Sequence, residues 1–134
     1  MQIEVEQLSE LKKTNTELYK KLSKHIDDKS TVLNIKIGNN RKIIYVKDIC
    51  WIEADDYCVI VHTNNDAAYT MRSTLKALEN KLSNNFLRVH RKAIANMDMA
   101  KELNLSQSPK LILQNNIEIP VSKSNLKMVK DFID

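Results

Sequence analysis

A single glycine, Gly38, is present among the 134 residues of this chain. Phosphate-cradling loops and the Gly-x-Ser-x-Gly nucleophile turn each need more glycines than that, so both kinds of site are excluded. Turns must therefore use other residues, and asparagine tolerates a positive φ best among them. Four Asn-Asn pairs, three of them between predicted strands, are the predicted turns: 39–40, 64–65, 84–85 and 115–116.

From Thr31 onward, β-branched residues and period-two alternation dominate the sequence. They predict strands at 32–37, 43–46, 49–53, 57–63, 67–71, 86–90, 99–105, 110–114 and 117–121. Two short helices are predicted where apolar residues recur with spacing i, i+3, i+7, after candidate caps at Ser73 and Ser124. The predicted fold is mostly β, with one or two short helices.

An N-terminal α-helix is predicted over residues 3–26, which contain neither glycine nor proline. A heptad seam runs along it through Leu8, Leu11, Asn15, Leu18, Leu22 and His25. An inner Asn costs a parallel two-stranded coil stability but fixes its register and its pairing. Two interpretations stay open: a dimerising coiled coil, or an amphipathic helix that packs on its own domain. Residues 1–29 would form this helix and a linker, and residues 30–134 the β domain.

The sequence indicates a cytoplasmic protein that does not insert into a membrane. Its longest aliphatic run, Val59-Ile60-Val61, is far shorter than the roughly 20 residues of a membrane helix. Its N-terminus is acidic where a secretory signal would be basic. Cys50 and Cys58 lack a Cys-x-x-Cys spacing and are expected to be buried, reduced thiols. No residue pattern points to a bound cofactor.

Three acidic residues, Glu53, Asp55 and Asp56, lie between two predicted strands. Clustered carboxylates can bind a divalent metal and serve a phosphodiesterase, although Asp is also ordinary turn chemistry. No second cluster of acids or histidines accompanies them in the sequence. His62 is expected to be a strand residue with a satisfied ring rather than a metal ligand.

Basic residues gather at Arg88, His90, Arg91 and Lys92. The net charge of the chain is +4, and the whole surplus lies in residues 30–134, where fifteen Lys and Arg face eleven acids. If the strand 86–90 ends in a loop, Arg88 and His90 share one face and the next two residues form the tip. Arginine can pair with guanine or phosphate and lysine with phosphate, so all four residues, Arg88 included, are candidate DNA contacts. Taken alone, such a run is more often a solvated surface patch.

Four segments, in order, resemble signatures of the LytTR DNA-binding domain family. They are WIEADDY at 51–57, YTMRSTL at 69–75 with Leu78, Glu79 and Leu82, FLRVHRKAIAN at 86–96, and IPVSK at 119–123. The resemblance covers residues 31–133. It implies an elongated domain of antiparallel strands that places loops, rather than a recognition helix, into successive major grooves of promoter DNA.

The same resemblance implies which residues contact DNA. Three loops would supply them: Asp56 and Tyr57 from the first, His90, Arg91 and Lys92 from the second, and Ser122 and Lys123 from the third. Lys92 stands where the family more often has Ser, and Lys123 where Arg is frequent. The first turn also lacks the glycine that is common there, so Asp56 must accept from a cytosine amino group or stand clear of phosphates.

The expected function is a sequence-specific transcription regulator of double-stranded DNA that acts without catalysis. Two alternatives are an interaction module that works through the N-terminal helix, and a nuclease built on Glu53, Asp55 and Asp56. Strand cleavage would identify the nuclease, and a lack of saturable DNA affinity would identify the interaction module. About thirty residues precede the domain, fewer than a receiver domain needs. Control is therefore expected through the helix, through abundance or through another protein, such as the membrane-bound inhibitor that pairs with some family members.

We predict that residues 1–27 hold two chains in a parallel dimer. At micromolar concentration, sedimentation should give a dimer mass for the full chain and a monomer mass for a chain that begins at Lys29. Asn15→Ile should raise dimer stability and admit higher oligomers, because the buried amide disfavours them. Equal masses for the two chains would contradict this prediction.

Overall fold

A computed structural model describes residues 31–134, so the predicted helix over 3–26 lies outside the described residues. The described part contains ten strands in three antiparallel sheets. A hairpin forms the first sheet, from β1 (Val32–Ile37) and β2 (Asn40–Tyr45). The central sheet has the order β5-β4-β3-β7-β6, and the third sheet has the order β10-β9-β8. The predicted mostly β fold is confirmed.

The central sheet consists of β3 (Ile49–Asp55), β4 (Cys58–Thr63), β5 (Ala68–Met71), β6 (Phe86–His90) and β7 (Ala93–Asn96). The third sheet consists of β8 (Ala100–Asn104), β9 (Lys110–Leu113) and β10 (Glu118–Pro120). Two α-helices, α3 (Leu75–Glu79) and α4 (Leu126–Ile133), complete the described part. Three 3₁₀ turns, η1 (Val46–Asp48), η2 (Met97–Met99) and η3 (Lys123–Asn125), join elements.

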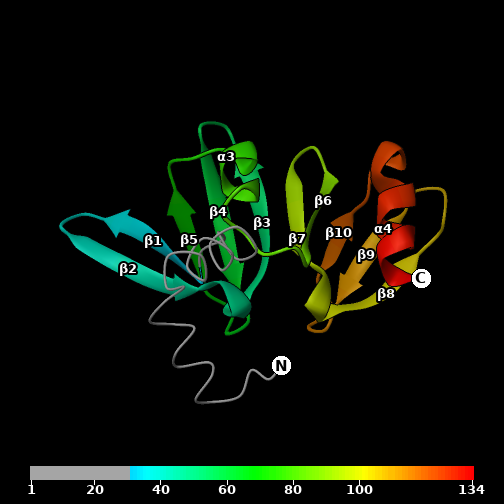
Figure 1. Cartoon of the computed structure of the whole chain (residues 1–134), viewed down its shortest axis with the longest axis horizontal. Coiled ribbons are helices and arrows are strands. Elements are labelled where there is room, and N and C mark those ends of the chain that lie inside the picture. The colour runs from blue at the N-terminus through cyan, green and yellow to red at the C-terminus, as the bar shows by residue number, and fades with distance from the viewer. Residues whose placement is uncertain (1–30) are drawn as a thin grey trace, which may run out of the picture.

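Two hydrophobic cores lie on opposite faces of the central sheet. The first core joins that sheet to the β1–β2 hairpin and to α3 through residues such as Ile35, Ile94 and Leu78. The second core joins it to the third sheet and to α4 through residues such as Leu111 and Val129. The hairpin, the central sheet and the third sheet therefore follow one another along the long axis of an elongated molecule (Figure 1).

A bulge in β3 allows this strand to contribute apolar side chains to both cores. The register with β4 shifts between Ile49 and Trp51, so one extra residue faces the partner strand there. Ile49 and Ile52 contribute to the first core, whereas Cys50 and Trp51 contribute to the second. The extra residue thus places two consecutive apolar side chains in the second core.

All four Asn-Asn pairs lie at turns, as predicted. The expectation that asparagine supplies the left-handed residues of these turns is mostly wrong. Besides Gly38, the residues with positive φ are Asp56 at 56°, Asp66 at 66° and Asn116 at 64°. Of these, Asn116 alone belongs to an Asn-Asn pair. Aspartate can also adopt the left-handed conformation, because its short polar side chain can hydrogen-bond to nearby backbone groups.

The predicted caps are displaced, although both predicted helices exist. The N-cap of α3 is Thr74 rather than Ser73, and the Oγ1 of Thr74 accepts a hydrogen bond from the N–H of Ala77 at 3.1 Å. Ser124 lies inside η3, and α4 begins without a side-chain cap. Strand β7 was not predicted from the sequence, and its four residues are all buried.

The predictions that Cys50 is buried and that His62 is a strand residue with a partnered ring are confirmed. Cys50 is buried, Cys58 is half-buried, and neither forms a disulfide. Burial raises the pKa of the Cys50 thiol. His62 stacks on Trp51 with 4.6 Å between ring centroids, and its Nε2 lies 2.7 Å from Oε2 of Glu53. Within residues 31–134, none of the helices has the length and apolar character needed to cross a membrane.

Candidate nucleic-acid interface

Three chain segments meet along one edge of the molecule, the upper edge in Figure 1. They are the β3–β4 turn, the β6–β7 loop and the segment that leads from β10 into α4. We call them the first, second and third tips. They contain seven of the eight residues expected from the sequence to contact DNA: Asp56, Tyr57, His90, Arg91, Lys92, Ser122 and Lys123. The eighth, Arg88, lies on β6 just below the second tip.

Backbone hydrogen bonds tie the three tips together. The N–H of Ala54, just before the first tip, donates to the carbonyl of Lys92 in the second tip at 2.9 Å. The N–H of Ser122 in the third tip donates to the carbonyl of Val89 on β6 at 2.9 Å. A small hollow of about 210 Å³, lined by Trp51, Glu53 and His90 among others, lies where the tips meet. The tips are therefore held at fixed positions relative to one another.

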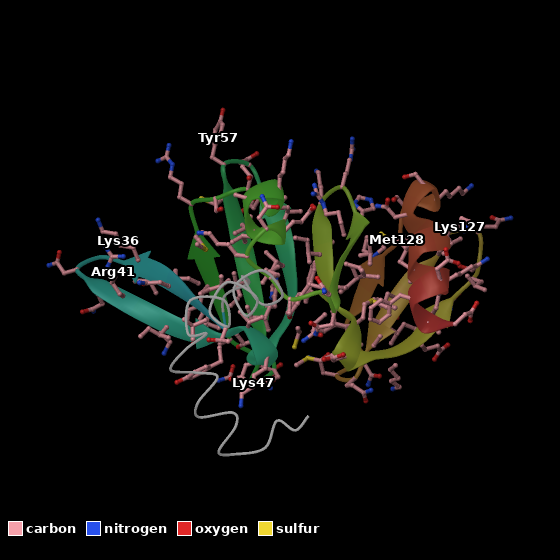
Figure 2. The ribbon with its side chains drawn as sticks, viewed as in Figure 1. Lys36, Arg41, Lys47, Tyr57, Lys127 and Met128 are labelled. Atoms are coloured by element: carbon pink, nitrogen blue, oxygen red, sulfur yellow. The ribbon has the colours of Figure 1, made fainter. Side chains whose placement is uncertain are left out.

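The first tip is the tight turn of Asp56 and Tyr57, which joins residues Asp55 and Cys58 that face each other across the hairpin. Asp56 takes the left-handed conformation in which glycine is usual. Tyr57 is 84% exposed, and its ring points away from the domain, as Figure 2 shows. This tip offers one aromatic hydroxyl and two exposed carboxylates.

The acidic trio does not gather into a metal site. The carboxylate of Glu53 lies against His62, whereas Asp55 and Asp56 are exposed at the turn. Among residues 31–134, no group of three His, Cys, Asp or Glu side chains is arranged to hold a metal ion. The geometry therefore adds nothing to the nuclease alternative.

The prediction that Arg88 and His90 share one face of the strand is wrong. The register of β6 with β7 shifts between these two residues, so Arg88 faces Ile94 and His90 faces Ala93. Ile94 belongs to the first core and Ala93 to the second. A bulge at Val89 therefore turns the two polar side chains to opposite sides of the sheet.

The second tip exposes Arg91 and Lys92 between β6 and β7. The N–H of Lys92 donates to Nδ1 of His90 at 3.1 Å, so the imidazole stabilises the loop from within. Arg88 is directed back into the protein: its guanidinium bonds to the carbonyls of His90 and Arg91 and pairs with Glu79. Arg91 and Lys92 are thus exposed to solvent, whereas the guanidinium of Arg88 is bonded to other groups of the protein.

The third tip begins at Ser122, whose φ of −71° and ψ of 149° direct the chain into η3. Ser122 is half-buried and its hydroxyl lies 3.3 Å from that of Ser124. Lys123 is exposed. This tip presents one cation and two hydroxyls beside the second tip.

Two further exposed cations lie at the same edge, and the sequence analysis did not single them out. Arg72 follows β5, whose last residue Met71 faces Val59 on β4, so Arg72 lies beside the first tip. Lys127 is in the first turn of α4 at the upper right of Figure 2, and its Nζ lies 2.9 Å from Asp131. The strand directions could have placed Arg72 at this edge. Because β4 lies between β3 and β5 and is antiparallel to both, β3 and β5 must end at the same edge.

Residues 39–134 match the LytTr DNA-binding domain family. The chain belongs to this family. LytTR relatives include the sensory transduction protein LytT of Bacillus subtilis (strain 168), which is 33% identical over 104 residues covering 75% of this chain. LytT of Bacillus cereus is 30% identical over 104 residues, and LytR of Streptococcus mutans is 25% identical over 99.

The LytTR fold is matched by a solved structure as well. The LytTr DNA-binding domain of a putative methyl-accepting/DNA response regulator from Bacillus cereus superposes with a TM-score of 0.70. The match covers 78% of this chain and 97% of that domain, at 21% sequence identity. The matched regions are only 43%, 42% and 40% of the three curated relatives, so this chain corresponds to less than half of each.

We predict that Ser122→Pro weakens the connection between the second and third tips. Proline removes the N–H that bonds to Val89, while its ring fits the observed φ. Leaving that carbonyl without its partner should lower the free energy of unfolding by about 1–3 kcal/mol in urea titrations. Ser122→Ala keeps the N–H and should stay within about 0.5 kcal/mol of the parent. Equal stability of the two variants would contradict the role assigned to this bond.

Proposed function

We propose that this chain is a sequence-specific, DNA-binding transcription regulator that acts without catalysis. Membership in the LytTR DNA-binding domain family supports this function. The observation that carries it is the edge itself: three tips, tied by backbone hydrogen bonds, present exposed cations side by side. An edge of this kind can follow a DNA groove with several loops at once.

The proposed contacts divide into base-reading and phosphate-binding groups. Arg91 is the proposed base reader, because its planar fork matches O6 and N7 of guanine in the major groove. The proposed phosphate-binding residues are Lys92, Lys123, Lys127 and Arg72. The lysines would act as point charges, and the arginine would use its planar fork of donors.

The uncharged and acidic groups of the three tips have proposed roles too. The hydroxyls of Tyr57 and Ser122 suit phosphate oxygens, and His90 supports the loop or donates to a base. Asp56 can accept a hydrogen bond only from a donor such as the cytosine amino group, since phosphates repel it.

The assembly and the partners are proposals drawn from the sequence. We propose that residues 3–26 join two chains, so that two linked domains bind paired half-sites with a raised effective concentration. A membrane-bound inhibitor protein is the proposed partner that controls access to DNA. Two cysteines that form no disulfide with each other fit action in the cytoplasm, where thiols are kept reduced.

Selection of bound sites from random duplexes tests the proposed function. The expected result is one enriched sequence, bound more tightly than its scrambled version and left uncut in the presence of magnesium. Binding should also be insensitive to a chelator. Cleavage that a chelator abolishes would favour the nuclease alternative, and enrichment of no sequence would contradict specific binding.

We predict that DNA affinity falls steeply with salt. If about five Lys and Arg of one domain bind phosphates, log K should fall against log salt with a slope of roughly −4.5. Lys92→Ala and Lys123→Ala should each lower the magnitude of the slope by about one and weaken binding to all duplexes alike. Lys47 lies at the opposite edge in Figure 2, so Lys47→Ala is the matched control and should leave the slope unchanged. A flat salt dependence of the parent protein would contradict DNA binding through this edge.

We predict that Arg91→Ala costs about 1–3 kcal/mol on the selected duplex and little on a random duplex. Arg91→Lys should recover only part of the loss, because an ammonium keeps the charge but not the fork. Equilibrium titrations of the three proteins on both duplexes, at one salt concentration, measure this. An unchanged ratio of selected to random affinity in Arg91→Ala would remove Arg91 as a base reader.

A further inference from the structure

Arg88 bonds to three groups within the protein, although it belongs to the basic run that resembles the DNA-contacting segment of the family. Its side chain is 31% exposed and lies on the α3 side of the central sheet, opposite Ile94. Nε donates to the carbonyl of His90 at 3.1 Å, and Nη2 donates to the carbonyl of Arg91 at 2.7 Å. Nη1 donates to Oε2 of Glu79.

The two carbonyl bonds bear directly on the orientation of the second tip. They bind consecutive peptide units at the point where β6 passes into the loop. Because the donors of a guanidinium form a rigid planar fork, they hold those two carbonyls in a fixed relation to each other. The conformation of Arg91 and of Lys92, the next residue, therefore depends on where the guanidinium of Arg88 lies.

Glu79 is the third partner of that guanidinium. It is the last residue of α3, a helix fixed to the first core by the buried side chains of Leu75 and Leu78. Its carboxylate therefore comes from a well-anchored element, and its charge-assisted bond to Arg88 is of the stronger class. Without this partner, the long side chain of Arg88 would be drawn toward solvent or toward a DNA phosphate.

We propose that Arg88 and Glu79 are positioning residues, which hold the second tip in the conformation that binds cognate DNA while Arg88 itself does not touch the DNA. The proposal rests on the proposed function, because it assigns these residues a role in presenting Arg91 and Lys92. It makes an acidic residue necessary for tight binding to a polyanion.

A competing account treats Arg88 as one more cation available to phosphate and Glu79 as an acid that competes for it. The two accounts predict opposite signs for Glu79→Gln. On the competing account, removing a negative charge raises affinity for every duplex. On the positioning account, Glu79→Gln lowers affinity for the selected duplex by about threefold to tenfold and lowers the ratio of selected to random affinity.

Glu118→Gln is the matched control for the loss of one negative charge. Glu118 also pairs with a cation on the surface, Lys110 at 3.3 Å, but it lies at the start of β10, at the end of the strand away from the third tip. Fluorescence titrations of the full chain and of both variants, on the selected and on a random duplex, should place Glu118→Gln at or slightly above the affinity of the parent.

A second measurement needs no DNA. Amide hydrogen exchange at Arg91 and Lys92 should quicken in Glu79→Gln and in Arg88→Lys, and should match the parent in Glu118→Gln. Exchange in the buried strand β7 should stay slow in all four proteins, which separates a freed loop from general unfolding.

Faster exchange in the loop together with lower selected-duplex affinity in Glu79→Gln supports the positioning role. Unchanged exchange, or an affinity equal to or above that of the parent, overturns it. If the parent protein itself binds no duplex selectively, the proposed function fails, and the exchange measurement still decides whether the Glu79–Arg88 pair holds the loop.

Discussion

The five-stranded central sheet buries apolar side chains on both of its faces, and both flanking units pack their apolar faces against it. A lone two-stranded hairpin such as β1–β2 is marginally stable in water, and the third sheet has only three short strands. Both pack on the central sheet, one on each side, through the cores that contain Ile94 and Leu111. The strand order of the central sheet also fixes which strand ends meet, since β3, β7 and β6 are neighbours in antiparallel order. The first and second tips therefore lie at the same edge.

Fixed tips matter for recognition by loops. A recognition helix carries its side chains on a rigid scaffold, whereas a loop must be held in place by its neighbours. Here Lys92 and Val89 accept backbone hydrogen bonds from the adjoining tips, and Arg88 holds two carbonyls of the second tip from below. Positions held in this way reduce the entropy lost on binding, so more of the contact energy remains for affinity.

Most of the strands can be predicted from the sequence because half-buried strands have period-two alternation of β-branched residues. Strand β7 cannot, because Ala93, Ala95 and Asn96 have low strand propensity and burial on both faces removes the alternation. Arg88 and His90 were expected on one face, because a bulge such as the one at Val89 is not visible to a simple alternation rule. The basic residues of the second tip stand out in the sequence itself, whereas the residues of the first and third tips came from a family resemblance. The bond from Ser122 to Val89 and the Glu79–Arg88 pair could be found only from the structure.

Amide chemical-shift mapping with the selected duplex tests the central claim, that this edge is the DNA-binding surface, most directly. The account predicts that the largest changes fall on Tyr57, Arg91 and Lys123, one from each tip, with small changes at Lys36 and Lys47, which Figure 2 places away from that edge. Largest changes around Lys36 on the β1–β2 hairpin, or around Lys47 on the opposite edge, would contradict it.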